Sequence, residues 1–226
     1  MWSEPALVDW CEPNYAFSTL VAEGWNTASS LLLVGLGVVG ATWLDGRRFR
    51  AGMLGLAVVG AGSALFHGTL TRWAQAADEL PMIWLGLACM WTLAQRDRPS
   101  GQGAGLAAVL GAFGAVFTLA YAAVPWAFVL FLLVYGTMVG WLAVRTAWLS
   151  SGGPAALQRA AWLTILAYLE GFFLFWVPEH LVLPCEHPAQ ALQLHAWWHV
   201  GAGVGTAAWW TWAWLDRSRA HAGGDP

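Results

Sequence analysis

The sequence contains no lysine, and charged side chains of any kind are scarce. Charged residues make up 10% of the 226 residues, whereas soluble domains average about 25%. Apolar residues make up 58%, above the usual share of roughly 45–50%. This composition excludes a typical water-soluble domain. The missing lysine also excludes a retinal protein of the rhodopsin type, because that chemistry requires a lysine amine to form a Schiff base.

Positive charge is also too sparse for nucleic-acid binding. Ten arginines stand against thirteen acidic residues, so the net charge is −3. Recognition of a phosphate backbone depends on Lys and Arg side chains that neutralise a row of phosphates. We therefore expect no nucleic-acid partner.

Seven apolar stretches approach the length of about 20 residues that a helix needs to cross a bilayer. They cover approximately residues 24–44, 51–70, 80–94, 104–122, 125–149, 157–177 and 190–215. These runs are too long for strands and lack alternation, and the Gly and Ala residues along them favour close helix packing. The sequence therefore predicts an all-α membrane protein, built as a seven-transmembrane helix bundle.

Arginine placement predicts the orientation of this bundle, because cytoplasmic loops retain Lys and Arg near the span ends. Only Arg72 falls on the side opposite to the other nine. Those nine are Arg47, Arg48, Arg50, Arg96, Arg98, Arg145, Arg159, Arg217 and Arg219. We expect an outer amino-terminal segment over residues 1–23, the bundle over residues 24–215, and a cytoplasmic carboxyl-terminal tail over residues 216–226.

Two of the three cysteines are placed to form a crosslink. Cys11 and Cys185 both fall on the predicted outer side, where oxidation is permitted, while Cys89 lies inside the third span. This placement predicts a disulfide between Cys11 and Cys185, with two free thiols as the alternative.

Histidine spacing gives the first candidate site. The run HAWWH places His195 and His199 four residues apart on one helix face, which suits two imidazoles on one metal ion. His67 lies near the outer end of the second span, and a rise of about 1.5 Å per residue brings all three histidines to a similar depth. Three imidazoles with one open position are typical of catalytic zinc. A packed polar patch and a haem site are the alternatives.

Other polar residues are candidates for chemistry at this depth. Ser63 lies one turn below His67, where its hydroxyl either donates to a developing oxyanion or fills a helix contact. Asp78 and Glu79 come just before a proline, so they either cap the third span or supply a carboxylate that moves a proton. Glu170 lies well inside the sixth span, where proton transfer and hydrogen bonding to a substrate are both open.

The amino-terminal run DWCEPNY carries oxygen donors that favour a calcium ion. Asp9, Glu12 and Asn14 lie close together in this run, and Glu23 follows at the entrance to the first span. Calcium prefers such carboxylate and amide oxygens. An acidic, solvated segment without a metal is the alternative.

Together these runs resemble the alkaline ceramidases, seven-span amidases of the wider superfamily that includes the adiponectin receptors. The matching runs are DWCEPNY, AEGWNTASS, SALFHGTL, DELPM and HAWWH, in the family's order and separation. The resemblance implies zinc held by His67, His195 and His199, with Ser63 and Asp78 beside it. It also implies the Cys11–Cys185 disulfide, and calcium held by Asp9, the carbonyl of Trp10, Glu12, Asn14 and Glu23.

The sequence departs from the family pattern around the sixth span. Glu170 and the run VPEHLVLPC differ from it, and Glu179 takes the place of a family aspartate. These departures leave the acyl-chain and headgroup preference open.

The resemblance implies zinc-dependent hydrolysis of the amide bond of ceramide or a related N-acyl lipid, giving a fatty acid and a sphingoid-type amine. The use of Arg alone, with much Ala and Gly, indicates a bacterium of high genomic GC content. We therefore expect an inner-membrane protein whose active site faces the periplasm. The alternatives are a lipid-binding sensor with structural zinc, a phospholipid hydrolase of the same superfamily, and an ion or proton transporter.

Overall fold

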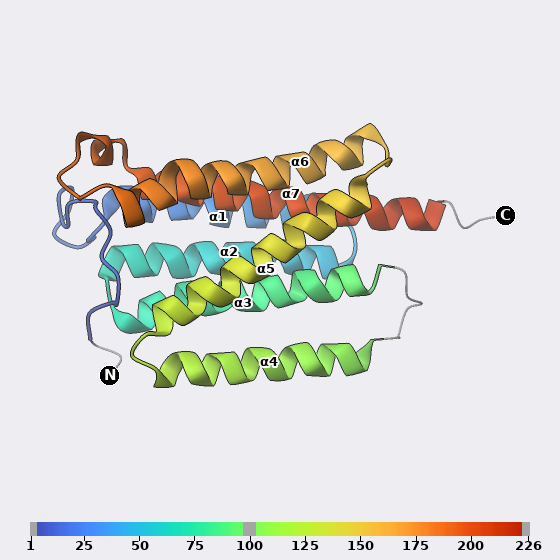
Figure 1. Cartoon of the computed structure of the whole chain (residues 1–226), viewed down its shortest axis with the longest axis horizontal. Coiled ribbons are helices and arrows are strands. Elements are labelled where there is room, and N and C mark those ends of the chain that lie inside the picture. Colours follow the sequence, from blue (N-terminus) through green and yellow to red (C-terminus); the bar gives the residue numbers. More distant parts are fainter. Residues whose placement is uncertain (1–3, 97–102, 223–226) are drawn as a thin grey trace.

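Seven long α-helices form a bundle in the computed structural model, which describes residues 4–96 and 103–222 (Figure 1). The helices are α1 (Gly24–Trp43), α2 (Arg47–Thr69), α3 (Arg72–Ala94), α4 (Ala104–Ala123), α5 (Ala127–Ser150), α6 (Ala155–Glu170) and α7 (Leu194–Ala222). Two π-helical segments, η1 (Gly171–Trp176) and η2 (Pro178–Val182), extend α6, and the 3-10 helix η3 (Pro188–Leu192) precedes α7. Within the described ranges there is no strand, so the all-helical prediction is confirmed.

Five helical segments are long and apolar enough to cross a membrane. They are α1, α2, α4, α5 and the continuous segment Ala155–Val182, which joins α6 to η2. Helices α3 and α7 have 23 and 29 residues, so they are long enough, but among the described residues neither contains an 18-residue stretch that is apolar enough to be recognised. That α3 and α7 also cross the membrane, as the third and seventh spans, therefore remains a prediction.

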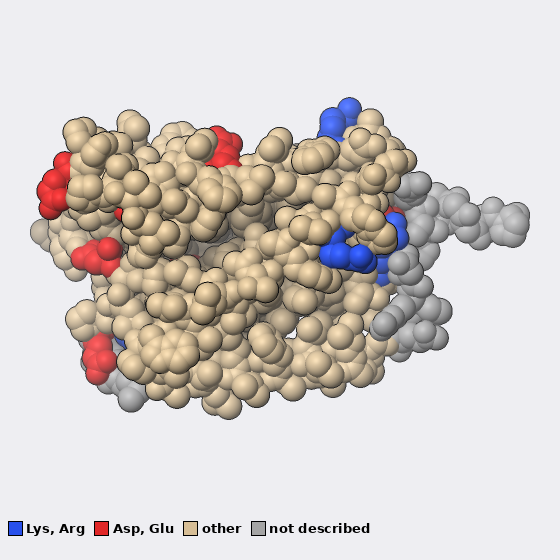
Figure 2. Space-filling model, viewed as in Figure 1, with Lys and Arg blue, Asp and Glu red and all other residues tan. Residues whose placement is uncertain are grey.

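Charges separate between the two ends of the bundle (Figure 2). Acidic side chains gather mainly at the amino-terminal end, where the chain starts, and arginines gather mainly at the opposite end. The two termini also lie at opposite ends (Figure 1). This separation is the pattern on which the predicted orientation depends, although Arg98 and the side chain of Arg219 lie outside what the structure describes.

Helix α3 begins earlier than predicted. We expected the third span to start at residue 80, with Asp78 and Glu79 either capping it or supplying a carboxylate, but both residues lie inside α3, which begins at Arg72. The early turns contain polar residues that pair inside the protein, such as Gln75, whose Nε2 donates to Glu79 Oε1 at 2.7 Å. Hydropathy therefore missed these turns, and the capping interpretation is wrong.

Helices α2 and α3 approach very closely at Gly62. A Cβ atom placed on Gly62 would lie 1.9 Å from the carbonyl oxygen of Ala77. Because Pro81 has no N–H, the helix cannot use this carbonyl in its ordinary hydrogen bond four residues along. Gly62 packs against this carbonyl, which lacks its ordinary hydrogen bond within the helix. Ser63 follows Gly62 in α2 and Asp78 follows Ala77 in α3, so the contact sets Ser63 beside Asp78.

Helix α7 continues past residue 216, where we expected the tail to begin, as far as Ala222. Its extension is tied to the turn that follows α3, because Arg96 of that turn pairs with the buried Asp216 through Nε at 2.5 Å and Nη2 at 3.0 Å. The remaining tail residues, 223–226, lie outside the described residues.

Gly62→Ala is expected to push α2 and α3 apart, because the added methyl group has no room beside the α3 backbone. Overpacking of this kind costs about 1–3 kcal/mol, which lowers the melting temperature by roughly 2–12 °C for a chain of this size. Gly111→Ala in α4 is the matched control, since nothing lies within 4 Å of its added Cβ. Thermal unfolding in detergent, followed by circular dichroism, measures both variants. Equal melting temperatures would contradict the close contact.

Candidate functional site

Three histidines converge at the amino-terminal end of the bundle. His67 lies in the last turn of α2, and His195 and His199 lie in the first turns of α7. All three side chains are buried, and one ring nitrogen of each lies within 4.8 Å of the others. Among the described side chains, in residues 4–96 and 103–218, no other three from His, Cys, Asp or Glu meet this closely. The histidines therefore share one depth, as the spacing predicted.

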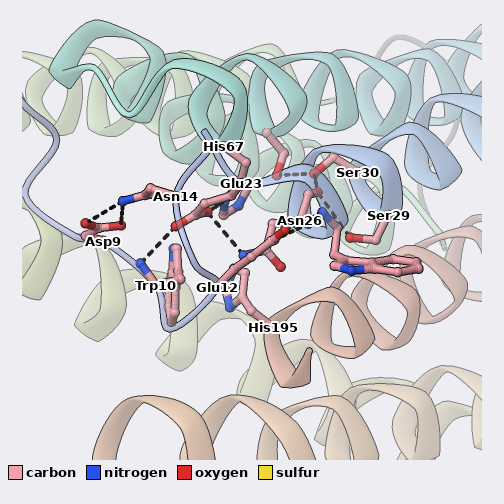
Figure 3. A network of polar contacts seen from close by, with 12 residues as sticks. Asp9, Trp10, Glu12, Asn14, Glu23, Asn26, Ser29, Ser30, His67 and His195 are labelled. Carbon is pink, nitrogen blue, oxygen red and sulfur yellow. Dashed lines mark hydrogen bonds and ion pairs between the residues drawn. The ribbon is translucent and has the colours of Figure 1, made fainter. Parts of the chain in front are cut away.

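Two of these imidazoles, those of His67 and His199, are held through their Nδ1 atoms, and Figure 3 shows His67 beside Glu23. His67 Nδ1 contacts the buried Glu23 carboxylate, and His199 Nδ1 lies 2.8 Å from the Ser29 hydroxyl. Partners at Nδ1 fix the tautomer and leave the Nε2 lone pair free for another bond. His67 Nε2 is buried and finds no hydrogen-bond partner among the described residues. Such an orphaned nitrogen, facing two further imidazoles, fits a metal ion.

His195 is enclosed by the outer segment and by η2. Its ring stacks on Trp10 with centroids 3.5 Å apart, and its Nδ1 faces Glu179 Oε2 at 3.5 Å. The other Glu179 oxygen accepts the Cys11 N–H at 3.3 Å. Cys11 is itself joined to Cys185, so the predicted disulfide is confirmed. Sequence reasoning identified Glu179 only as a family substitution and missed its place beside a histidine.

Ser63 and Asp78 lie next to the histidines. Ser63 Oγ accepts a hydrogen bond from Ser30 Oγ at 3.0 Å, and Ser30 Oγ lies 3.4 Å from His199 Nδ1. The Asp78 carboxyl lies near Ser63, and both residues line the same cavity. The structure thus brings one hydroxyl and one carboxylate to the three imidazoles.

A cavity of about 330 Å³ leads from these residues along the bundle. Its walls are mainly apolar and come chiefly from α2, α3, α5, α6 and α7. His195 lines one end, and Trp209 lines the cavity fourteen residues further along α7, a span of about 21 Å at the helical rise. The volume lies in the range of small-molecule sites, and the length suits an extended hydrocarbon chain.

Glu12 serves as a cap for α1 (Figure 3). Its two carboxylate oxygens accept the N–H groups of Trp25 at 2.6 Å and Asn26 at 2.9 Å. These are two of the donors that the first turn of a helix leaves unpaired, and a negative charge is favourable at that end. Glu12 was predicted only as a calcium ligand, and its capping role was missed.

The other predicted calcium ligands form one loop beside the histidines (Figure 3). Asn14 Nδ2 donates to both Asp9 oxygens at 3.1 and 3.2 Å, and Glu23 Oε1 accepts the Trp10 N–H at 3.0 Å. Partial burial raises the pKa of Asp9, the Asn14 amide opposes the rise, and the nearby Glu23 charge adds to it. Asp9 and Glu23 thus place negative charge on this loop, which a cation would neutralise.

Glu170 lies away from this site. Its side chain is exposed at the end of α6 and does not line the cavity. The structure therefore does not bring Glu170 to the histidines, whichever role the sequence left open for it.

The fold and the site define a helical membrane protein in which three buried histidines lie at one end of a cavity about as long as a lipid hydrocarbon chain. The family model described as Ceramidase matches residues 3–224, and the chain belongs to this family. The chain is 30% identical to alkaline ceramidase 3 of Mus musculus, over 89% of this chain and 80% of the relative. It is 27% identical to the putative alkaline ceramidase dcd3A of Dictyostelium discoideum, over 90% and 84% of the two chains. Family membership makes the protein a hydrolase of the amidohydrolase type.

Glu12→Ala is expected to destabilise the protein by about 1–3 kcal/mol, because it leaves two N–H groups of α1 without an acceptor. Glu12→Gln keeps one acceptor oxygen and is expected to lose about half as much. Chemical or thermal unfolding in a calcium chelator measures the cap without any contribution from a bound ion. Glu186→Ala, at an exposed loop residue, is the control. Equal stability of Glu12→Ala and Glu186→Ala would rule out the cap.

Proposed function

We propose that the protein hydrolyses the amide bond of ceramide or a related N-acyl lipid, giving a free fatty acid and a sphingoid-type amine. The observation that carries this proposal is the buried group of three imidazoles at the end of an apolar cavity, beside Ser63 and Asp78. The relatives named alkaline ceramidases support the class of substrate.

We assign zinc to the site formed by His67, His195 and His199. Three imidazoles with a free coordination position suit catalytic zinc, and the orphaned Nε2 of His67 supports this assignment. When bound, zinc supplies a Lewis acid for the amide carbonyl and lowers the pKa of a water molecule.

Asp78 and Ser63 then divide the proton transfer and the charge stabilisation. The Asp78 carboxylate accepts a proton from water as the water oxygen bonds to the carbonyl carbon. Ser63 donates a hydrogen bond to the carbonyl oxygen, which gains negative charge in this step. When the carbon–nitrogen bond breaks, Asp78 returns the proton to the departing amine nitrogen.

The lipid enters sideways between α5 and α6. Several residues that line the cavity are also open to the outside, among them Gly136 and Gly140 of α5 and Leu169 of α6. Figure 2 shows the surface hollowed between these two helices. In this proposal all seven helices cross a bacterial inner membrane, with the histidines toward the periplasm and the arginine-rich end in the cytoplasm.

We also propose that the acidic loop holds calcium. Its ligands would be Asp9, the Trp10 carbonyl, Glu12, Asn14 and Glu23. The support is their assembly from one short segment and the start of α1 (Figure 3). Oxygen donors of this kind suit a hard cation.

His199→Ala is expected to lower the zinc content from about one ion per chain to nearly none and to abolish hydrolysis, because two imidazoles hold zinc far less firmly than three. His187→Ala, in an exposed loop, is the control and keeps its zinc. Elemental analysis of the purified protein counts zinc and calcium in the same sample. An active, zinc-replete His199→Ala protein would refute the assignment.

Asp78→Asn is expected to retain zinc but to lose about 10²–10⁴-fold in rate, since the amide cannot accept the proton. Release of a fluorescent fatty acid from a labelled ceramide measures this rate. Binding of the lipid by the wild-type protein without product release would instead indicate a sensor. Hydrolysis of a matched phospholipid ester, with the amide left intact, would indicate a phospholipase.

A further inference from the structure

A chain of hydroxyl groups crosses the apolar part of the cavity. Tyr135 of α5, Tyr168 of α6 and Thr206 of α7 all line it. The Tyr135 and Tyr168 hydroxyls lie 3.3 Å apart, and the Tyr168 hydroxyl lies 2.6 Å from Thr206 Oγ1. Neighbouring wall residues at this level include Val139 and Ile165, so the three hydroxyls form a polar strip in apolar surroundings.

This hydroxyl chain lies well beyond the histidines. Thr206 follows His199 by seven residues, two turns of α7, which places it roughly 10 Å further along the cavity. A lipid whose carbonyl lies at the histidines would therefore pass the three hydroxyls with the middle of its hydrocarbon chain.

The hydroxyl chain has one donor more than it can use. Three hydroxyls carry three O–H donors, and the two hydrogen bonds between them use two, so one O–H at an end of the chain is left over. Thr211, one turn further along α7, instead donates to the Ala207 carbonyl of its own helix at 2.9 Å. A spare donor beside apolar walls is costly unless a ligand atom accepts its hydrogen bond.

We propose that Tyr135, Tyr168 and Thr206 form a subsite for a hydroxyl group carried midway along a hydrocarbon chain of the substrate. The subsite rests on the proposed function, because the position of the carbonyl sets the distance. It makes hydroxylated N-acyl lipids the preferred class of substrate over their unsubstituted counterparts. The substrate hydroxyl accepts a hydrogen bond from the spare O–H. Its own O–H donates a hydrogen bond to one of the three hydroxyl oxygens of Tyr135, Tyr168 and Thr206.

Binding of the fatty-acid product tests the subsite without any turnover. The probes are a saturated long-chain fatty acid and its isomers with a hydroxyl at successive chain positions. Quenching of the cavity tryptophans Trp198 and Trp209 reports binding. We expect the isomer with its hydroxyl about 10 Å from the carboxyl to bind about three to ten times more tightly than the unsubstituted acid.

Variants separate recognition from helix packing. Tyr168→Phe and Thr206→Val are expected to abolish the preference for the hydroxylated acid while binding the unsubstituted acid normally. Thr211→Val is the matched control on α7 and keeps the preference. A purely structural role for the hydroxyl chain predicts that the first two variants lower the melting temperature and leave the preference unchanged. That result, or no preference at any chain position, would overturn the subsite.

Hydrolysis assays identify which limb of the lipid occupies the subsite. One N-acyl lipid carries the hydroxyl in its acyl chain and another carries it in the amine-side chain. A preference for either one, lost in Tyr168→Phe, supports the subsite and names the limb. If no N-acyl lipid is hydrolysed at all, the proposed function fails, while the fatty-acid binding series still decides the subsite.

Discussion

A buried carboxylate–imidazole pair, Glu23 with His67, holds the amino-terminal end of the protein together. Both side chains are completely buried, and polar groups away from water must find partners inside the protein. Glu23 contacts His67 Nδ1 and Asn26 Nδ2 through one oxygen and the Trp10 N–H through the other. The backbone reinforces the pair, because the Glu23 N–H donates to the His67 carbonyl at 3.0 Å. Removing either partner would therefore leave several buried groups unsatisfied.

This pair makes the outer segment part of the histidine site. Glu23 links the loop of Trp10 to His67, and the chain from Cys11 through Glu179 gives His195 a second link to the same loop. Trp10 closes the arrangement by stacking on His195. Two of the three imidazoles thus take their orientation from residues that precede or follow the long helices. The helices set the depth of the histidines, and the connecting segments set the direction of their rings.

The spacing of residues along the sequence predicted those features of the site that are set within a single helix. The separation of His195 and His199, and the place of His67 near a span end, fix face and depth through helix geometry alone. Partners from other segments escape such reasoning. Glu179 becomes a buried neighbour of His195 at the end of a segment whose π-helical turns change the register after α6. Asp78 resembled a cap because tertiary pairing, and not hydropathy, determines where α3 begins.

The helices differ in how much of their surface lies inside the bundle, and hydropathy recognises five helical segments and not all seven helices. The apolar α1, α4, α5 and α6–η2 segments are only 17–28% buried, whereas α2 is 56% buried. Helix α7 packs against α1, α2, α3 and α6, and α3 packs against α2, α4, α5 and α7. Polar residues such as Asp78 and His199 are costly in a bilayer unless protein encloses them. The outer helices provide that enclosure for Asp78 of α3 and His199 of α7, whose helices are not recognised as spans, whereas α2 carries Ser63 and His67 and is still apolar enough to be recognised.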